Sequence, residues 1–188
     1  MDAAGTAADP NMSTVNYPAE WKRVAHTLDG VEYGIRPIRA DDLLRDKDFI
    51  MGLSPESRYT RMFAVMREPS AALLEQFVHV DYHSSMAFVA VIGAEEHERI
   101  IGVARYAADS NTHDCEFAVA VADSWQARGV GATLTSLLFD YARIQGFHKL
   151  HGDVLASNHR MVELVHWLGM ETHRQPDDAT LVEASREP

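Results

Sequence analysis

Hydrophobic residues occur in short runs or at alternating positions through most of the chain, and both patterns are typical of strands. Polar segments separate these runs, as at 93–99 and 111–114. We expect strands at 31–38, 86–92, 100–106, 115–121 and 149–155, and two shorter ones at 171–174 and 180–184.

Other hydrophobic residues recur every three or four positions, which is the spacing of one face of a helix. This spacing predicts helices over 73–78, 130–141 and 161–168. Gly146 and Gly169 follow the last two, where glycine commonly ends a helix.

Two more helices are expected near the start of the chain. Asp41 or Asp42 can cap a helix that runs toward Met51. Ser54 precedes Pro55, and proline is favoured in the first turn, so a second helix is expected to begin there.

The order of these elements defines the fold class. One strand is followed by helices, three strands, a helix, a strand, a helix and two strands, which predicts an α/β (α+β) domain built on a mixed sheet. Residues 1–20 are polar and show no period, so we expect a poorly ordered arm. Residues 21–188 are enough for one domain.

Charge and cysteine content exclude several classes of function. The 17 Lys and Arg against 28 Asp and Glu give a formal net charge of -11, which argues against nucleic-acid binding. Cys115 is the single cysteine, so neither an intrachain disulfide nor a Cys-x-x-Cys zinc site can form. Residues 1–18 lack signal-peptide features, and the apolar run at 86–94 is too short to span a bilayer. We expect a cytoplasmic protein that binds no metal.

Residues 126–132 form a candidate anion site between a predicted strand and a predicted helix. Gly129 and Gly131 allow a ligand to approach the backbone, and amides at a helix start have no partners within the helix. Arg128 adds a positive charge. A plain turn and helix start is an equal interpretation, and Leu134 stands where a dinucleotide-binding motif needs a third glycine.

Segments of the chain resemble a known family. Residues 126–132 resemble the Q/R-x-x-G-x-G/A motif of GNAT acetyltransferases, and residues 158–170 resemble their second signature, an Asn followed by a helix that ends in Leu-Gly. Residues 35–42, 53–59 and 115–121 are similar to the acetyltransferase domain of bacterial protein lysine acetyltransferases of the Pat type.

The resemblance implies a mostly antiparallel central sheet flanked by helices, with acetyl-CoA as cosubstrate. Backbone groups of two strand residues would pair with the pantetheine arm, the amides of the glycine motif would hold the pyrophosphate, and an asparagine would lie near the thioester. The cofactor-binding candidates are Val119, Val121, Gln126, Arg128, Gly129, Val130, Gly131, Ala132 and Asn158. A simple helix cap is the alternative for Asn158.

Glu116 is the candidate catalytic residue. It interrupts an apolar run, and strand alternation places it on one face with Ala118 and Ala120, away from Phe117. An acid on a face of small side chains leaves room for a ligand, and Pat-type enzymes resemble this chain in having a catalytic Glu on this strand. A structural acid paired with Arg105 is the alternative.

Other chemistry-bearing residues carry weaker signals. The tyrosine that protonates the leaving thiolate in many GNAT enzymes is replaced by Val165, so solvent would supply that proton. Cys115 faces away from Glu116 and is a poor candidate for a covalent route. His151 and Asp153 share a strand face, but two ligands do not make a metal site.

The sequence therefore predicts direct acetyl transfer in a ternary complex. Glu116 would deprotonate a primary amine, directly or through water, and a strand amide near Val119 would stabilise the oxyanion. The Pat-like segments favour a protein lysine as acceptor, with Arg58, Tyr59 and Arg61 near the acceptor cleft or on an ordinary helix surface. The alternatives are a small-molecule acetyltransferase for a polyamine, amino acid or drug amine, and a non-catalytic acyl-CoA-binding regulatory module. The oligomeric state is open, a homodimer included.

Overall fold

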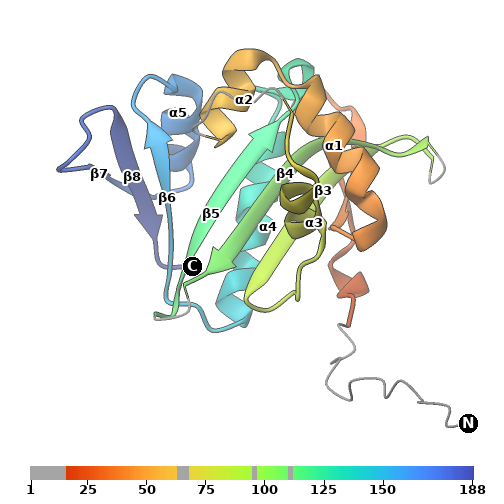
Figure 1. The fold of residues 1–188 in the computed structure, drawn as a ribbon, viewed down its shortest axis with the longest axis horizontal. Helices are drawn as coiled ribbons and strands as arrows, with labels where there is room; N and C mark the ends of the chain where they lie inside the picture. Colours follow the sequence, from red (N-terminus) through yellow and green to blue (C-terminus); the bar gives the residue numbers. More distant parts are fainter. Residues whose placement is uncertain (1–15, 63–67, 95–96, 110–111) are drawn as a thin grey trace, which may run out of the picture.

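The computed structural model describes residues 16–62, 68–94, 97–109 and 112–188 (Figure 1). Within them the helices are η1 (Ala19–Trp21), η2 (Ala40–Asp42), α1 (Leu43–Gly52), α2 (Pro55–Met62), α3 (Ala71–Val78), η4 (Asp123–Trp125), α4 (Val130–Ile144) and α5 (His159–Trp167). The strands are β1 (Arg23–His26), β2 (Glu32–Pro37), β3 (Ser85–Ile92), β4 (Arg99–Ala108), β5 (Asp114–Val121), β6 (Lys149–Leu155), β7 (Glu171–Arg174) and β8 (Leu181–Arg186).

The strands of the described residues form one eight-stranded sheet in the order β1-β2-β3-β4-β5-β6-β8-β7. Neighbouring strands are antiparallel except β5 and β6, which run parallel. A parallel pair needs a crossover connection, and α4 provides it. The expected mixed, mostly antiparallel sheet flanked by helices is confirmed.

Helices cover both faces of the sheet (Figure 1). On one face α1 and α3 pack on β3 and β4, and the buried residues there include Ile50 and Val89. On the other face α4 crosses behind β3 to β5, and its Leu134 and Leu138 are buried against residues such as Phe88. Each sheet face is therefore closed by an apolar layer, which leaves the site to form where strands or helices end.

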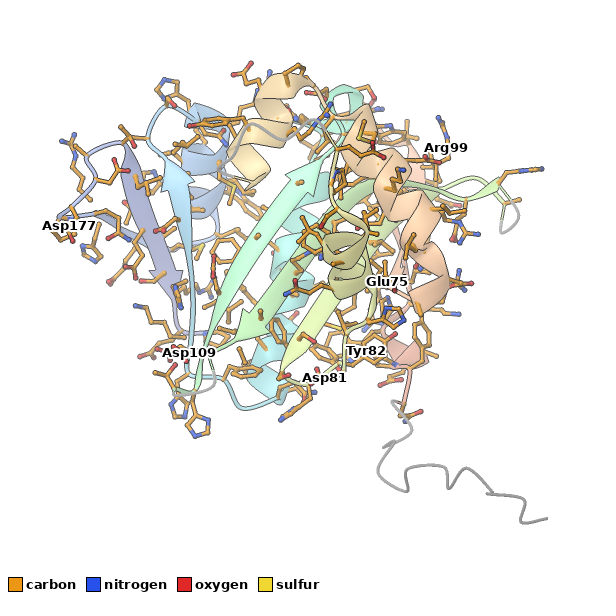
Figure 2. The ribbon with its side chains drawn as sticks, in the orientation of Figure 1. Glu75, Asp81, Tyr82, Arg99, Asp109 and Asp177 are labelled. Atoms are coloured by element: carbon orange, nitrogen blue, oxygen red, sulfur yellow. The ribbon has the colours of Figure 1, made fainter. Side chains whose placement is uncertain are left out.

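The connection from α3 to β3 ties the two faces together at one end of the sheet, where Figure 2 labels Asp81 and Tyr82. The Tyr82 hydroxyl donates to Ile38 O at 2.8 Å, and Tyr82 O accepts a hydrogen bond from the Tyr141 hydroxyl at 2.6 Å. Tyr141 belongs to α4, so this connection links α4 to the end of β2 and fixes the position of α4.

One strand was missed by the sequence analysis, and one expected helix cap was wrong. Strand β1 was not predicted, because Arg23–His26 is mostly exposed at a sheet edge and shows no apolar alternation. Asp42 occupies the N-cap position of α1, but its side chain does not cap that helix. Its carboxylate is fully buried and accepts hydrogen bonds from both terminal nitrogens of Arg36, at 2.6 and 2.7 Å.

The residues just before β1 pack on the domain. The Tyr17 hydroxyl donates to Pro37 O at 3.1 Å, Pro18 is buried, and the Trp21 ring meets Tyr141 edge-on at 5.0 Å. The rest of the expected arm, residues 1–15, lies outside the described residues. In the part of the chain that the structure describes, no helix combines the length and apolarity required to cross a membrane.

Candidate active site

Strands β5 and β6 are paired along only the first part of their length. The ladder ends at the pair Glu116–His151, although β5 continues to Val121 and β6 to Leu155. Beyond this pair the strands diverge (Figure 1), and we call the region between Phe117–Val121 and Gly152–Leu155 the fork. The fork opens the sheet at one point in its middle.

Gly152 forms the base of the fork. A Cβ atom at this position would lie 2.7 Å from Phe117 O and 3.1 Å from two carbons of the Phe117 ring. Only a residue without a side chain allows such a close approach of the two strands. The strands therefore touch at Gly152 and separate after it.

Backbone amides of β5 face into the fork. Ala122 N donates to Ile101 O of β4 at 2.9 Å. Successive residues of a strand turn their amide groups to opposite sides, so Ala120 also faces β4, whereas Val119 and Val121 face the fork. Because the ladder with β6 ends before these residues, their N–H groups lie outside it.

Helix α4 begins beside the fork with Gly129 as its N-cap residue. The φ angle of Gly129 is 88°, a left-handed conformation that favours glycine. Thr133 N donates to Gly129 O at 3.0 Å, so the amides of Val130, Gly131 and Ala132 precede the helical hydrogen bonds. No side chain of the described residues caps them. Free amides and the helix dipole together suit an anion.

Gly131 lies between β5 and α5. A Cβ atom on it would meet Val121 Cγ2 at 3.4 Å and Leu164 Cδ2 at 3.5 Å. A side chain at residue 131 would therefore point into the contact between β5 and α5. A larger residue would press on Val121 and Leu164 and move β5 and α5 apart at the start of α4.

Glu116 lies at the end of the paired part of β5. Its side chain is exposed, whereas Cys115 and Phe117 on either side are buried, as the alternation predicted. A surface depression of about 170 Å³ adjoins it, lined by Arg105, Tyr106, Ala107, Glu116, Phe117 and Ala118. Among the described residues the Glu116 carboxylate forms no ion pair or hydrogen bond. A carboxylate without a partner among the described residues therefore borders an open space next to the fork.

Comparison with known proteins assigns the fold and site to a family. The sequence model of the "Acetyltransferase (GNAT) family" matches residues 53–170. The chain belongs to the GNAT acetyltransferase family. An acetyltransferase of Pseudomonas aeruginosa is 41% identical over 154 residues, which cover 82% of this chain and 83% of that protein.

Relatives named Pat are also similar to this acetyltransferase. Acetyltransferase Pat of Mycolicibacterium smegmatis is 31% identical over 141 residues, which cover 74% of this chain and 41% of Pat, so the chain spans less than half of that relative. The crystal structure of the GNAT domain of S. lividans PAT matches with a TM-score of 0.84 and 28% identity, covering 92% of this chain and 100% of that domain.

In this acetyltransferase Arg128 turns toward the β1–β2 connection. Its Nη2 and Nε atoms donate to the Asp29 carboxylate at 2.5 and 3.1 Å, and its guanidinium lies 4.7 Å from the centroid of the Trp125 ring. The hydrogen bond from Arg128 lowers the pKa of Asp29 to about 2. Since Asp29 already balances this arginine, the amides of α4 are the main attraction for an anion.

Gln126 joins three elements around the fork. Its Nε2 donates to Val121 O at 3.0 Å and to Ser57 Oγ at 3.1 Å, and its Oε1 accepts from Arg160 at 2.6 Å. Ser57 in turn donates to Asp123 at 2.7 Å. Gln126 thus fixes β5, α2 and α5 relative to one another, and Val121 O is already engaged. A direct contact of Gln126 with the cofactor stays a prediction.

Asn158 caps a helix, as the alternative interpretation held. Its Oδ1 accepts from Met161 N at 3.2 Å at the start of α5. The other atoms of its amide could still meet a cofactor, and that role stays a prediction. Val165, at the place of the usual family tyrosine, is buried in the core.

Weaker functional signals in the sequence came from Cys115, the metal-ligating side chains, Arg58 and Arg61. Burial raises the pKa of the Cys115 thiol to about 12, so a thiolate nucleophile is unsuited to this position. The described residues contain no group of three metal-ligating side chains. Arg58 donates to Leu53 O at 3.0 Å, which ties α2 to the end of α1. The side chain of Arg61 lies outside the described residues.

Sequence reasoning missed two residues next to the fork and the start of α4. Arg160 contacts Gln126 across 34 positions of sequence, and Asp29 contacts Arg128 across 99. Neither residue stands in a motif, and an exposed charged residue is common on any surface. No local signal in the sequence could have found these pairs.

Proposed function

We propose that this acetyltransferase transfers an acetyl group from acetyl-CoA to a primary amine, with Glu116 as general base. The observation that carries the proposal is the position of an exposed, uncommitted Glu116 at the point where β5 and β6 separate. A thioester lying in the fork and an amine lying in the depression would meet beside this carboxylate.

The residues around the fork fit acetyl-CoA as a substrate. The Val119 backbone faces the fork and can pair with the amide-rich pantetheine arm. The amides of Val130, Gly131 and Ala132 can hold the pyrophosphate, which answers the problem that a net charge of -11 poses for an anionic ligand. Val121 contributes its N–H alone, because Gln126 occupies its carbonyl oxygen.

The chemistry requires a neutral amine. A lysine-like amine has a pKa of ~10.4, so deprotonation at pH 7 costs about 4.6 kcal/mol. Glu116 accepts that proton, directly or through one water, as nitrogen attacks the thioester carbonyl. The carbonyl becomes a tetrahedral oxyanion beside the Val119 N–H, and it collapses with breakage of the carbon–sulfur bond. The nitrogen loses its second proton to water as the intermediate collapses, so the products are the acetylated amine, the CoA thiolate, one proton on Glu116 and one proton in solvent.

Val165 stands at the place of the usual acid, and the proposed mechanism takes the proton for the leaving thiolate from solvent. The free thiol of CoA has an ordinary pKa of ~8.5, so its thiolate is a good leaving group and can take a proton from water. Glu116 is exposed and returns its proton to solvent. The cycle closes without a second titrating residue.

A protein lysine is the proposed acceptor. The depression beside Glu116 is open and about 170 Å³ in volume, which suits a single extended side chain better than a buried small molecule. The similarity to relatives named Pat agrees with this choice. A polyamine or amino acid would use the same depression, and product analysis separates the acceptors.

The substitution Glu116→Gln tests the proposed base. It should lower kcat about 10²-fold or more at pH 7 with unchanged acetyl-CoA affinity by calorimetry, and the deficit should shrink as pH rises and free amine becomes abundant. Glu163→Gln, on the exposed surface of α5, is the matched control. Near-full activity of Glu116→Gln would assign a structural role to Glu116.

The acceptor is tested by product identity. Labelled acetyl-CoA is incubated with a panel of amines and with a cell lysate, and products are identified by mass spectrometry. Acetyl-lysine on folded proteins supports the proposal. Efficient acetylation of a small amine without any acetyl-lysine would show that the acceptor is a small molecule and not a protein lysine.

A further inference from the structure

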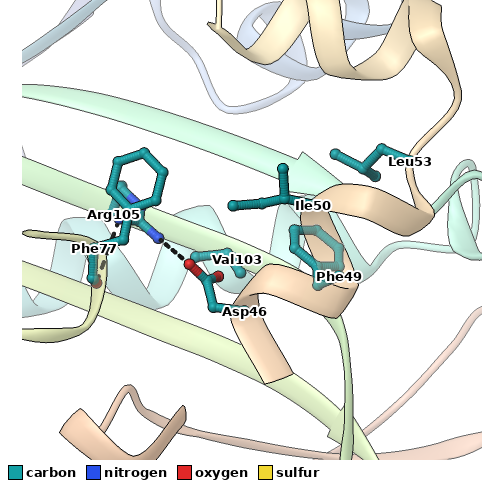
Figure 3. A pocket seen from close by; sticks show the side chains of 7 residues that line it. All are labelled: Asp46, Phe49, Ile50, Leu53, Phe77, Val103 and Arg105. Carbon is teal, nitrogen blue, oxygen red and sulfur yellow. Dashed lines mark hydrogen bonds and ion pairs between the residues drawn. The ribbon is translucent and has the colours of Figure 1, made fainter. Parts of the chain in front are cut away.

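Arg105 borders two separate spaces. On one side it lines the depression that contains Glu116. On the other it lines a cavity of about 10 Å³ between α1, α3 and β4 (Figure 3), together with Asp46, Phe49, Ile50, Leu53, Phe77 and Val103. That volume is about the size of one water and is too small for a substrate. The cavity therefore matters because the residues that line it contact Arg105.

Asp46 and Phe77 hold the Arg105 guanidinium on the α1 side. Nη2 of Arg105 lies 3.8 Å from Asp46 Oδ2, Nη1 donates to Phe77 O at 3.4 Å, and the guanidinium carbon lies 4.1 Å from the Phe77 ring centroid. Figure 3 shows the guanidinium against Phe77 with its ion pair to Asp46. The Asp46 side chain is 1% exposed, so a charge there requires a partner.

Arg105 can also reach Glu116. Arg105 lies opposite Ala118, and Glu116 lies opposite Ala107, so both side chains stand on one sheet face as diagonal neighbours. Diagonal neighbours are about 7–8 Å apart, within reach of a long side chain. Without the charge of Asp46, Arg105 would therefore have the Glu116 carboxylate within reach on its own sheet face.

We infer that Asp46 is a positioning residue, which holds Arg105 away from Glu116 and so keeps that carboxylate free to accept a proton. This inference rests on the proposed role of Glu116 as base. An ion pair with Arg105 would occupy the Glu116 oxygens and favour their ionised form, and both effects weaken a base. Asp46 acts through Arg105 and touches neither substrate.

Among the described residues, charged groups on β5, β6 and α2 lie in elements next to Glu116, and Asp114 of β5 shares its sheet face two residues away. On β6 His151 stands directly beside Glu116 in the register, and Lys149 on the same strand pairs with Glu183 at 3.1 Å. The helix that packs on β5, α2, carries Glu56, Arg58 and Arg61, and Arg58 binds the end of α1. His151 and Asp114 are therefore the groups to control for in a pH experiment, by His151→Gln and Asp114→Asn.

The first measurement titrates Glu116 without substrate. The carboxyl carbon resonance of Glu116 is assigned by its absence in Glu116→Gln and followed against pH in Asp46→Asn. Its midpoint should move to lower pH than in the unsubstituted chain, because freed Arg105 favours the carboxylate. The shift should persist when His151→Gln is added to both chains.

The second measurement is a rescue. Asp46→Asn should lower kcat/KM at least about tenfold with little change in acetyl-CoA affinity, and the acid limb of its pH profile should move to lower pH. Adding Arg105→Met removes the competing cation and should restore most of the rate. Removing both members of a buried ion pair can also restore stability, so urea titrations must show that each variant is fully folded under the assay conditions before the rates are compared.

An unmoved Glu116 midpoint in Asp46→Asn overturns the inference, as does a rate loss that Arg105→Met fails to restore. Failure of the proposed function is recognised separately. If Glu116→Gln stays fully active, Glu116 is not the base, while the titration still reports whether Asp46 controls the Arg105–Glu116 contact.

Discussion

The close contact at the base of the fork makes Gly152→Ala a sharp test of the structure. The new Cβ would lie 2.7 Å from Phe117 O, which is 0.7 Å short of the 3.4 Å of ordinary contact. The atom it meets is backbone, not the flexible end of a side chain, so β5 and β6 must move apart. Overpacking of this kind costs about 1–3 kcal/mol.

Thermal unfolding measures this cost. For a chain of this size about 2–4 °C is lost per kcal/mol, so Gly152→Ala should melt about 2–12 °C below the unsubstituted chain. Gly52→Ala is the matched control. Gly52 is the last residue of α1, and no atom lies within 4 Å of the position of a Cβ atom there. Because alanine has a higher helix propensity than glycine, the free energy of unfolding of Gly52→Ala should be equal to that of the unsubstituted chain or up to ~1 kcal/mol higher.

The same substitution should affect ligand binding. Displacement at the base of the fork moves β6 and α5 away from β5, so acetyl-CoA affinity by calorimetry should fall in Gly152→Ala and not in Gly52→Ala. Equal melting temperatures for Gly152→Ala and the unsubstituted chain would refute the close approach, and with it the account of why the strands separate at that residue.

Three further substitutions test other parts of the chain. Gly131→Val fills the space beside Leu164 and should lower acetyl-CoA affinity at least about tenfold by calorimetry; unchanged affinity would place the ligand elsewhere. Asp42→Asn breaks a buried ion pair and should lower the free energy of unfolding at pH 7 by about 3–5 kcal/mol in a urea titration. Burial alone would raise the pKa of Asp42, but the hydrogen bonds and charge of Arg36 lower it below its ordinary value. The ion pair therefore stabilises the fold above about pH 4, and this stabilisation is lost as pH falls. The difference in the free energy of unfolding between Asp42→Asn and the unsubstituted chain should narrow in acid. Cys115→Ala should keep its kcat, and the native thiol should resist a thiol reagent at pH 8 until the chain is unfolded; rapid labelling would contradict its burial.

The elements that face the core were predictable from the sequence. Strands such as β6 and helices such as α4 carry apolar residues at the period of their structure, and that period reflects burial. The same reasoning placed Glu116 on an exposed face, because an acid within an apolar strand can only point away from the core. Strand β1 was not predicted because an exposed edge strand has no buried face and therefore no apolar alternation in its sequence.

The partners of charged residues could not be predicted. Arg128 was assigned to an anion and is paired with Asp29, and Asp42 was assigned to a helix end and is paired with Arg36. Each choice depends on which distant segment folds against the charge. Local propensity carries no information on that, and the burial that makes Asp42 depend on Arg36 arises only when the sheet is assembled.

The order of the last strands affects how the sheet is completed. Strand β8 lies between β6 and β7, although β7 comes before it in the chain. During synthesis β7 therefore has no neighbour to pair with until Leu181–Arg186 has been made, and the outer side of β6 stays open until then. A chain cut before Leu181 would lose two strand pairings at once, β6 with β8 and β7 with β8, and would leave β6 as an unprotected edge, the kind of edge at which chains aggregate.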